Sequence, residues 1–376
     1  MPVMEVPSTM RAVVIEGDKA VVKTGVQVPG LAGNTALIKV KAVASNPTDW
    51  KHIFWQIGPQ GSILGCDVAG EIVSLGPEAD GRWAIGDKVC AMVHGASVKY
   101  PENGAFAEYA KVDLAICLKL KDLEYATADS SGVVPHGKVS TWEAAASIPV
   151  CLLTASNVLM NQLGNKLEWE PKNPQHPHSV LVWGGATVTG QFFIQLAKRT
   201  NAYANIVVVA SKKHESMLKG FGADEIFDYH DEDVLAQITK KYPDLYHILD
   251  AVATPSTFGQ VYACAPTDKP VTLVELISFS ENDIPPAERK SNVSINLTMM
   301  YLVSGESIPF GTVTFPADPK VRTSVIEFLE FIQPRIESGE IHHPAVKISK
   351  GLDTIPSLME DIKTGRNSGF KLVASL

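Results

Sequence analysis

The pattern of apolar residues divides the chain into a strand-rich first third and a later region where strands and helices alternate. Short apolar or alternating runs cover residues 11–15, 36–44, 68–75 and 86–93, with Gly and Pro between them. Runs of this length and period are typical of strands. The first third therefore predicts a small, partly open β-barrel.

From residue 180 the pattern changes. Apolar runs typical of buried strands cover residues 180–183, 206–210, 225–227, 247–250 and 271–276. Between them, segments at 190–199, 213–221 and 231–241 are expected to be helical. Such alternation predicts an α/β fold with a doubly wound parallel sheet.

The segments around this region also carry a pattern. Residues 141–160 are predicted to be helical with an interruption at Pro149, and the polar, proline-bearing stretch 168–179 is predicted to be a surface loop. The last part of the chain is expected to form helices at 321–338 and 355–364 and strands at 342–348 and 370–374.

The clearest chemical signal is the turn after the strand at 180–183. Two glycines end this strand, small residues follow, and Gly190 begins an amphipathic helix. A strand, a tight turn and a helix direct the N–H groups of the helix N-terminus at a phosphate. The dinucleotide fingerprint G-x-G-x-x-G is present with its middle glycine replaced. The turn predicts a pyrophosphate site formed by Gly185, Ala186, Thr187, Val188 and Thr189.

The end of the second strand of this unit indicates which dinucleotide binds. NAD sites usually have Asp or Glu there to bind the ribose 2′-hydroxyl. This chain has a hydroxyl, two cations and an imidazole instead, at Ser211, Lys212, Lys213 and His214. These groups suit a 2′-phosphate and favour NADPH; the alternative is that the two lysines only solubilise a loop.

Composition excludes several other classes. The chain has 376 residues, enough for two domains, and a net charge of −8, which argues against a general nucleic-acid binder. We find no apolar run of membrane-spanning length and no secretory signal. The five cysteines form no C-x-x-C pair, so no structural zinc site or disulfide framework is indicated. A cytoplasmic protein with reduced thiols is expected.

Six short motifs occur in the order found in the medium-chain dehydrogenase/reductase superfamily, which the chain resembles over essentially its whole length. They lie at residues 46–49, 64–70, 86–89, 104–109, 222–225 and 365–369. Within that superfamily the chain is most similar to zinc-free fungal members, the yeast NADPH-dependent aldehyde reductases and the trans-acting enoyl reductases. The resemblance implies a GroES-like catalytic domain of residues 1–155 with 311–376, a Rossmann domain of residues 156–310, and a monomer or homodimer.

Zinc members of the superfamily bind a catalytic metal through a Cys near the position of Asn46 and through a Gly-His-Glu motif. Here that motif is replaced by Gly65-Cys66-Asp67, and the span 94–103, which corresponds to a four-Cys lobe, has no cysteine. We therefore expect no metal, with Cys66 as a core residue and Asp67 as a buried acid that accepts backbone hydrogen bonds.

Without zinc, reduction of a conjugated C=C bond is favoured, because the charge spreads into an enolate that hydrogen bonds can stabilise. The similarity to yeast aldehyde reductases favours a reactive aldehyde instead, and both remain open. The expected partner is a small-molecule aldehyde, enone or quinone, with no nucleic acid and no membrane. The alternative from another class is a non-catalytic NADPH- or quinone-binding sensor or accessory subunit.

The resemblance also implies roles for individual residues. Those expected to contact the cofactor, besides the turn and the second strand end, are Thr48, Lys51, Thr154, Tyr229, Ser368 and Gly369. Those expected to be catalytic are Lys51, Thr154 and His52, although an ordinary half-buried histidine is the alternative for His52. The usual proton-donor tyrosine is replaced by Ile57, which leaves solvent or Lys51 for this task. The substrate pocket is expected to be lined by Trp50, Phe54 and Trp55, with core packing as the alternative.

Overall fold

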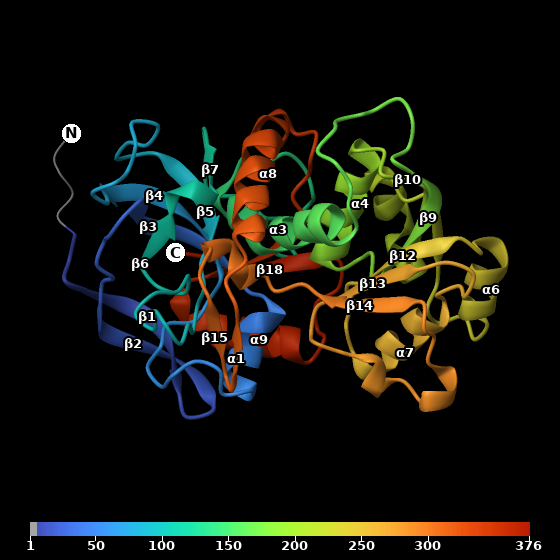
Figure 1. Cartoon of the computed structure of the whole chain (residues 1–376). Coiled ribbons are helices and arrows are strands. Elements are labelled where there is room, and N and C mark those ends of the chain that lie inside the picture. Colours follow the sequence, from blue (N-terminus) through green and yellow to red (C-terminus); the bar gives the residue numbers. More distant parts are fainter. Residues whose placement is uncertain (1–5) are drawn as a thin grey trace. The chain divides into compact units, whose positions relative to one another are not determined.

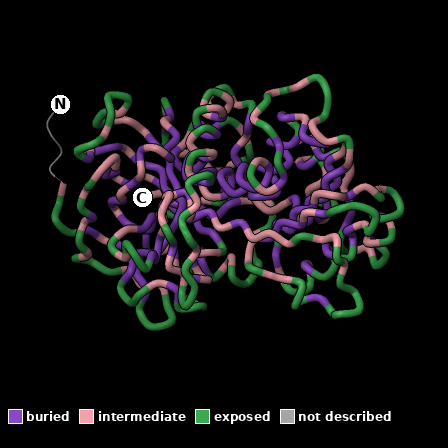
Figure 2. Tube along the Cα trace, in the orientation of Figure 1, coloured by how far each residue is buried: buried purple, intermediate pink, exposed green. Residues whose placement is uncertain are grey.

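The computed structural model describes residues 6–376, which divide into two compact units (Figure 1). One unit contains the residues up to Val150 together with Tyr301–Leu376, and the other contains Cys151–Met300. In each unit the buried residues gather along the strands of a sheet (Figure 2).

The first unit is built around a largely antiparallel, eight-stranded sheet with the order β7-β5-β4-β3-β18-β17-β8, in which β6 also pairs with β3. Its strands are β3 (Thr35–Ala44), β4 (Asp67–Leu75), β5 (Lys88–Met92), β6 (Tyr109–Asp113), β7 (Cys117–Leu120), β8 (Val133–Val134), β17 (Ala345–Lys350) and β18 (Phe370–Ser375). Two hairpins accompany it, β1 (Thr9–Glu16) with β2 (Lys19–Gln27) and β15 (Ile308–Phe310) with β16 (Val313–Phe315). The predicted strand-rich first third is confirmed.

The last part of the chain belongs to this unit through β17 and β18, so the sheet combines sequence from both ends. The helices of the unit are α1 (Pro47–Phe54), α2 (Trp142–Ala146), α8 (Pro319–Ser338) and α9 (Ile355–Lys363). Apolar side chains of β3, β4 and β18 pack with those of α9 in one core, which includes Ile38, Ile72, Leu358 and Leu372.

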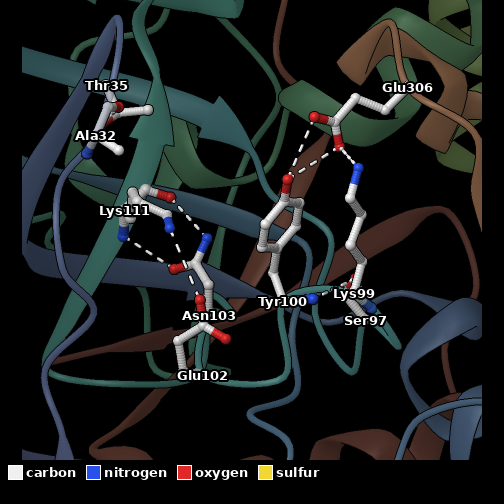
Figure 3. A network of polar contacts seen from close by, with 9 residues as sticks. All are labelled: Ala32, Thr35, Ser97, Lys99, Tyr100, Glu102, Asn103, Lys111 and Glu306. Atoms are coloured by element: carbon white, nitrogen blue, oxygen red, sulfur yellow. Dashed lines mark hydrogen bonds and ion pairs between the residues drawn. The ribbon is translucent and has the colours of Figure 1, made fainter.

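A polar network fixes the loop that follows β5 (Figure 3). Lys99 Nζ lies 2.6 Å from Glu306 Oε2, and the Tyr100 hydroxyl donates to the same oxygen at 3.1 Å. Asn103 accepts from Lys111 N at 3.0 Å and donates to Lys111 O at 2.9 Å. Hydrogen bonds and an exposed ion pair thus hold the span in which the zinc members of the superfamily carry four cysteines.

The second unit contains the predicted doubly wound sheet. Six parallel strands follow the order β11-β10-β9-β12-β13-β14. They are β9 (His176–Trp183), β10 (Tyr203–Val209), β11 (Glu225–Phe227), β12 (Leu245–Asp250), β13 (Val271–Glu275) and β14 (Val293–Leu297). The helices are α3 (Pro149–Asn157), which begins in the first unit, α4 (Val188–Arg199), α5 (Glu215–Phe221), α6 (Val234–Lys241) and α7 (Pro255–Ala263). The fold class is confirmed.

Two boundaries differ from the prediction for physical reasons. The surface loop predicted for 168–179 is wrong at its end, because β9 already begins at His176, which pairs with Tyr203 of β10. Histidines and a proline at this end of the strand hide it from an apolar pattern. The strand predicted at 342–348 runs instead over Ala345–Lys350, after Pro344, which has no N–H to donate to a ladder.

The expectation that no apolar run could span a membrane also needs correction. The helical stretch Trp142–Gln162 is 21 residues long with a mean hydropathy of 1.4, so by length and composition alone it could cross a membrane. However, 89% of its apolar window is buried inside the structure. That is the burial expected of a core helix, and core helices can reach the length and hydropathy of a membrane span.

Candidate functional site

Helix α1 is the element that carries most of the predicted site residues of the first unit. Asn46 precedes the helix, and Pro47 occupies its first turn, where a missing N–H costs nothing. The Asn46 N–H donates to Asp49 Oδ2 at 2.6 Å, so the Asp49 carboxylate caps the start of the helix. This local sequence fixes the start of α1 and, with it, the positions of Thr48, Lys51 and His52 on the helix.

Beside this helix start lies a buried ion pair between Lys371 of β18 and Asp67 of β4. Lys371 Nζ is 3.0 Å from Asp67 Oδ2, and the two side chains are 4% and 0% exposed. Asn46 donates from Nδ2 to Asp67 Oδ2 at 2.8 Å and accepts at Oδ1 from Lys371 Nζ. The Val150 N–H donates to Asp67 Oδ1 at 2.7 Å. Asp67 is therefore buried and accepts a backbone hydrogen bond, as the sequence predicts.

These partners decide whether the residues fit the zinc ion that part of the superfamily binds. Metal ligation requires a deprotonated thiol and available carboxylate lone pairs. Burial, reinforced by the charge of Asp49, raises the pKa of the Cys66 thiol well above its ordinary value. The Asp67 carboxylate is already neutralised by an ammonium and hydrogen-bonded at both oxygens. The residues present do not fit a zinc ion.

The Thr48 hydroxyl contacts the imidazole of His52, at 3.2 Å from Nδ1, and one tyrosine hydroxyl. Its Oγ1 lies 2.7 Å from the hydroxyl of Tyr301, a buried side chain whose ring stacks on His94 with centroids 3.7 Å apart. The Tyr301 hydroxyl is also 3.4 Å from Cys66 Sγ. The sequence analysis missed Tyr301 because it follows no motif and its contacts are far away in the chain.

His52 is fully buried, more so than the half-buried histidine predicted as the alternative to a proton donor. Its Nδ1 lies 2.8 Å from the Thr48 carbonyl oxygen, and burial lowers its pKa to about 4. The ring is therefore neutral at pH 7 and donates to this carbonyl. Among the described residues, its Nε2 has no hydrogen-bond partner. This nitrogen carries no proton in that tautomer, so it can accept a hydrogen bond but has no proton to donate.

The three predicted pocket residues fall into two groups. Trp50 packs against the apolar core of the unit, in agreement with the alternative prediction of core packing. Phe54 and Trp55 are 65% and 43% exposed. Lys51 Nζ lies 5.7 Å from the ring centroid of Trp50 and 5.6 Å from that of Trp55. Lys51, Phe54 and Trp55 thus form an aromatic and cationic surface, which suits a planar or anionic ligand.

In the second unit, the predicted phosphate turn has the close packing that demands glycine. A Cβ on Gly185 would meet Val208 Cγ1 at 2.2 Å, and one on Gly190 would meet the Gly184 carbonyl oxygen at 2.5 Å. The Thr187 hydroxyl accepts from Gly190 N at 3.0 Å and so caps α4. The first turn leaves the N–H groups of Val188 and Thr189 without intrahelical acceptors. The turn therefore fits the pyrophosphate of a dinucleotide.

The end of β10 presents positive charge, as predicted. Lys212 and Lys213 are exposed, and burial, with the charge of Lys213, lowers the pKa of His214. The nearby acid is Asp228, whose carboxylate accepts from Lys212 N at 3.0 Å and from His230 N at 3.0 Å. These N–H groups hold the Asp228 pKa at about 2.

The structure also gives the positions of the other residues predicted to contact the cofactor. Tyr229 is 51% exposed, with its ring centroid 4.1 Å from that of His230. Thr154 is buried on α3. Ser368 and Gly369 directly precede β18, and Gly369 has a φ of 78°. Their contacts with a cofactor remain predictions.

Two family models match the chain. Residues 32–122 match the alcohol dehydrogenase GroES-like domain, and residues 189–305 match the zinc-binding dehydrogenase family. An uncharacterized protein of Saccharomyces cerevisiae is 50% identical over 374 residues, which cover 99% of both chains. The trans-enoyl reductase milB of Cordyceps militaris is 30% identical over 98% of both chains. The solved quinone oxidoreductase of Coxiella burnetii has the same fold, with a TM-score of 0.65 and 21% identity over 98% of this chain and 99% of that one.

Proposed function

Because the chain belongs to the medium-chain dehydrogenase/reductase superfamily of nicotinamide-dependent oxidoreductases, we propose that it is an NADPH-dependent reductase of activated double bonds. The bond reduced is a C=C conjugated to a carbonyl, and a reactive aldehyde C=O is the second candidate. The reduced nicotinamide supplies the hydride when it is bound.

The observation that carries this proposal is the buried ion pair of Lys371 and Asp67. It supplies a fixed ammonium, hydrogen-bonded to Asn46, in the place where zinc members hold their metal. An ammonium engaged in this way is a poor substitute for a Lewis acid that must stabilise a localised alkoxide. An enolate disperses its charge and needs only hydrogen-bond donors. The relatives named trans-enoyl reductases support the same choice.

The residues of the chain divide the work as follows. The turn Gly184–Thr189 and the cations after β10 bind the diphosphate and the 2′-phosphate. The half-buried side chain of Lys51 and the exposed side chain of Trp55 bind the substrate. His52 is neutral at pH 7 and donates to Thr48, so the proton that completes the reduction comes from Lys51 or from solvent.

The decisive experiment compares a conjugated enal with the matching saturated aldehyde, using chelator-treated protein and NADPH. We expect the enal to be converted to the saturated aldehyde and the saturated aldehyde to react at least about tenfold more slowly, since its charge cannot spread into an enolate. Product analysis distinguishes the candidates: alcohol from both substrates identifies an aldehyde reductase. Tight NADPH binding without oxidation by any acceptor would favour the non-catalytic sensor or accessory subunit.

Cofactor choice is tested by removing the two exposed cations after β10. In the variant Lys212→Ala/Lys213→Ala, we expect the KM for NADPH to rise by about tenfold or more, because a charge-assisted contact to phosphate contributes about 1.5–3 kcal/mol. The KM for NADH should change by less than about twofold. A matched control is Lys240→Ala/Lys241→Ala on α6, which removes the same charge elsewhere in the unit. Equal effects on both cofactors would contradict the phosphate assignment.

A further inference from the structure

Three histidines meet at the amino ends of two neighbouring strands in the second unit. His176 and His178 lie on β9, where the strand is bulged against β10, and their rings come close together. His247 lies on β12, which pairs with β9. The phosphate turn follows the opposite end of β9, so the cluster is about 20 Å from it at roughly 3.3 Å per residue. The cluster belongs to neither the predicted cofactor site nor the zinc position of the superfamily.

The geometry of the cluster suits a metal ion. One ring nitrogen from each of the three histidines lies within 4.8 Å of the others. The ring centroids are 5.1, 4.8 and 4.7 Å apart. A tetrahedral ion with Zn–N bonds of about 2.0–2.1 Å places the centroids of its imidazole ligands on the order of 5 Å apart. Only small side-chain rotations are needed to bring the nitrogens onto one ion.

The surroundings of the rings resemble the outer contacts of metal-binding histidines. Such a histidine typically donates a hydrogen bond from one ring nitrogen to an oxygen and binds the ion through the other nitrogen. His178 Nδ1 lies 3.0 Å from the Ser179 carbonyl oxygen, and His247 Nδ1 lies 2.9 Å from the Tyr203 hydroxyl. That hydroxyl is held in turn by Asn165 Nδ2 at 2.9 Å.

His176 adds an independent observation. Its Nε2 is buried and, among the described residues, has no hydrogen-bond partner. A buried imidazole nitrogen without a partner carries a desolvation cost that an ion would remove.

We propose that His176, His178 and His247 bind one divalent transition-metal ion, namely zinc. Imidazole ligands suit zinc, and three of them leave a fourth position for water. The three residues are only partly buried, so an ion can reach them from solvent. The bound ion would tie β9 to β12 at the amino edge of the sheet, which gives it a stabilising role away from the reaction.

The test is a titration of the full chain after treatment with a chelator and its removal. Co²⁺ is the first probe, because tetrahedral coordination gives it intense visible absorption, and Zn²⁺ then competes. We expect one Co²⁺ per chain, its displacement by one Zn²⁺, and a higher Tm with zinc. The variants His247→Gln and His178→Gln should each lower the affinity at least about tenfold. Two variants are used so that a folding defect in one does not decide the result, and circular dichroism checks both.

The matched control is His342→Gln in the first unit. His342 and His136 bring their Nδ1 atoms within 3.4 Å, but among the described residues they belong to no group of three side chains whose ligand atoms converge. We expect this variant to titrate like the unchanged protein. Absence of stoichiometric Co²⁺ binding, or equal affinity in His247→Gln and the unchanged protein, would overturn the proposal. Because these readouts do not involve activity, they stand apart from the proposed reductase function.

Discussion

Replacing Lys371 with methionine is expected to lower the free energy of unfolding by about 3–5 kcal/mol, since removing one partner of a buried ion pair strands the other charge. Lys371 and Asp67 are 4% and 0% exposed, and no solvent can replace the lost ammonium. Methionine preserves most of the side-chain volume, so the loss reports charge rather than a cavity. Urea unfolding at pH 7, followed by circular dichroism, measures the change.

Two further variants separate this explanation from a general packing defect. Adding Asp67→Asn to Lys371→Met should restore at least about half of the lost stability, because the stranded charge is removed with its partner. Lys363→Met removes a lysine from an exposed pair with Glu360 on α9 and should change the stability by no more than about 1 kcal/mol. If Lys371→Met were as stable as Lys363→Met, the buried pair could not have the role assigned to it.

The same ion pair shows how far the sequence could predict this site. Asp67 was recognised from its position in a motif, and its burial and backbone hydrogen bond follow from the strand it begins. Local sequence assigns no role to Lys371, because its partner Asp67 lies near the other end of the chain. Only the placement of β18 beside β3 brings the two together. Local patterns predict elements and turns, whereas a charge pair across a sheet depends on strand order.

The same distinction applies to the second unit. The phosphate turn was predicted because its glycines, its cap and its helix are contiguous in sequence. The three histidines were not, since His247 is distant from the other two and β9 begins within a segment that looks like a loop. Tyr301 is a third case: its contacts with Thr48 and Cys66 join residues that share no motif.

Asp49 should contribute to the pH dependence of stability with a sign opposite to that of the buried histidines, whose lowered pKa values make their own contributions rise with pH. Its carboxyl group is buried at the start of α1, and burial raises its pKa from 3.8 to about 7, although the hydrogen bond from Asn46 and the charge of Lys371 act in the opposite direction. One oxygen accepts from Asn46, and the other has no hydrogen-bond partner among the described residues. The folded protein therefore pays a desolvation penalty whenever this group ionises.

The sign of the effect follows from proton linkage. Between pH 4 and 7 the folded chain holds a proton on Asp49 that the unfolded chain has released, so the contribution of this group to stability falls as the pH rises through this range. From pH 5 to pH 8, the loss attributable to this group is about 2–3 kcal/mol, at 1.36 kcal/mol per pKa unit. Asp49→Asn keeps an oxygen to accept from Asn46 but cannot ionise. The stability of this variant minus that of the unchanged protein should therefore rise by about 2–3 kcal/mol from pH 5 to pH 8.

Urea unfolding of both proteins at half-unit intervals from pH 5 to pH 8 measures this difference. Asp353→Asn is the matched control, because this carboxylate is exposed and pairs with Arg11 at the surface. Its curve should run parallel to that of the unchanged protein across the range, since this variant leaves Asp49 and its surroundings unchanged. Parallel curves for Asp49→Asn as well would mean that Asp49 is already charged at pH 5. In that case the ammonium of Lys371 would have to neutralise both Asp67 and Asp49, and the loss in Lys371→Met should then exceed 5 kcal/mol, above the range of about 3–5 expected for a single pair.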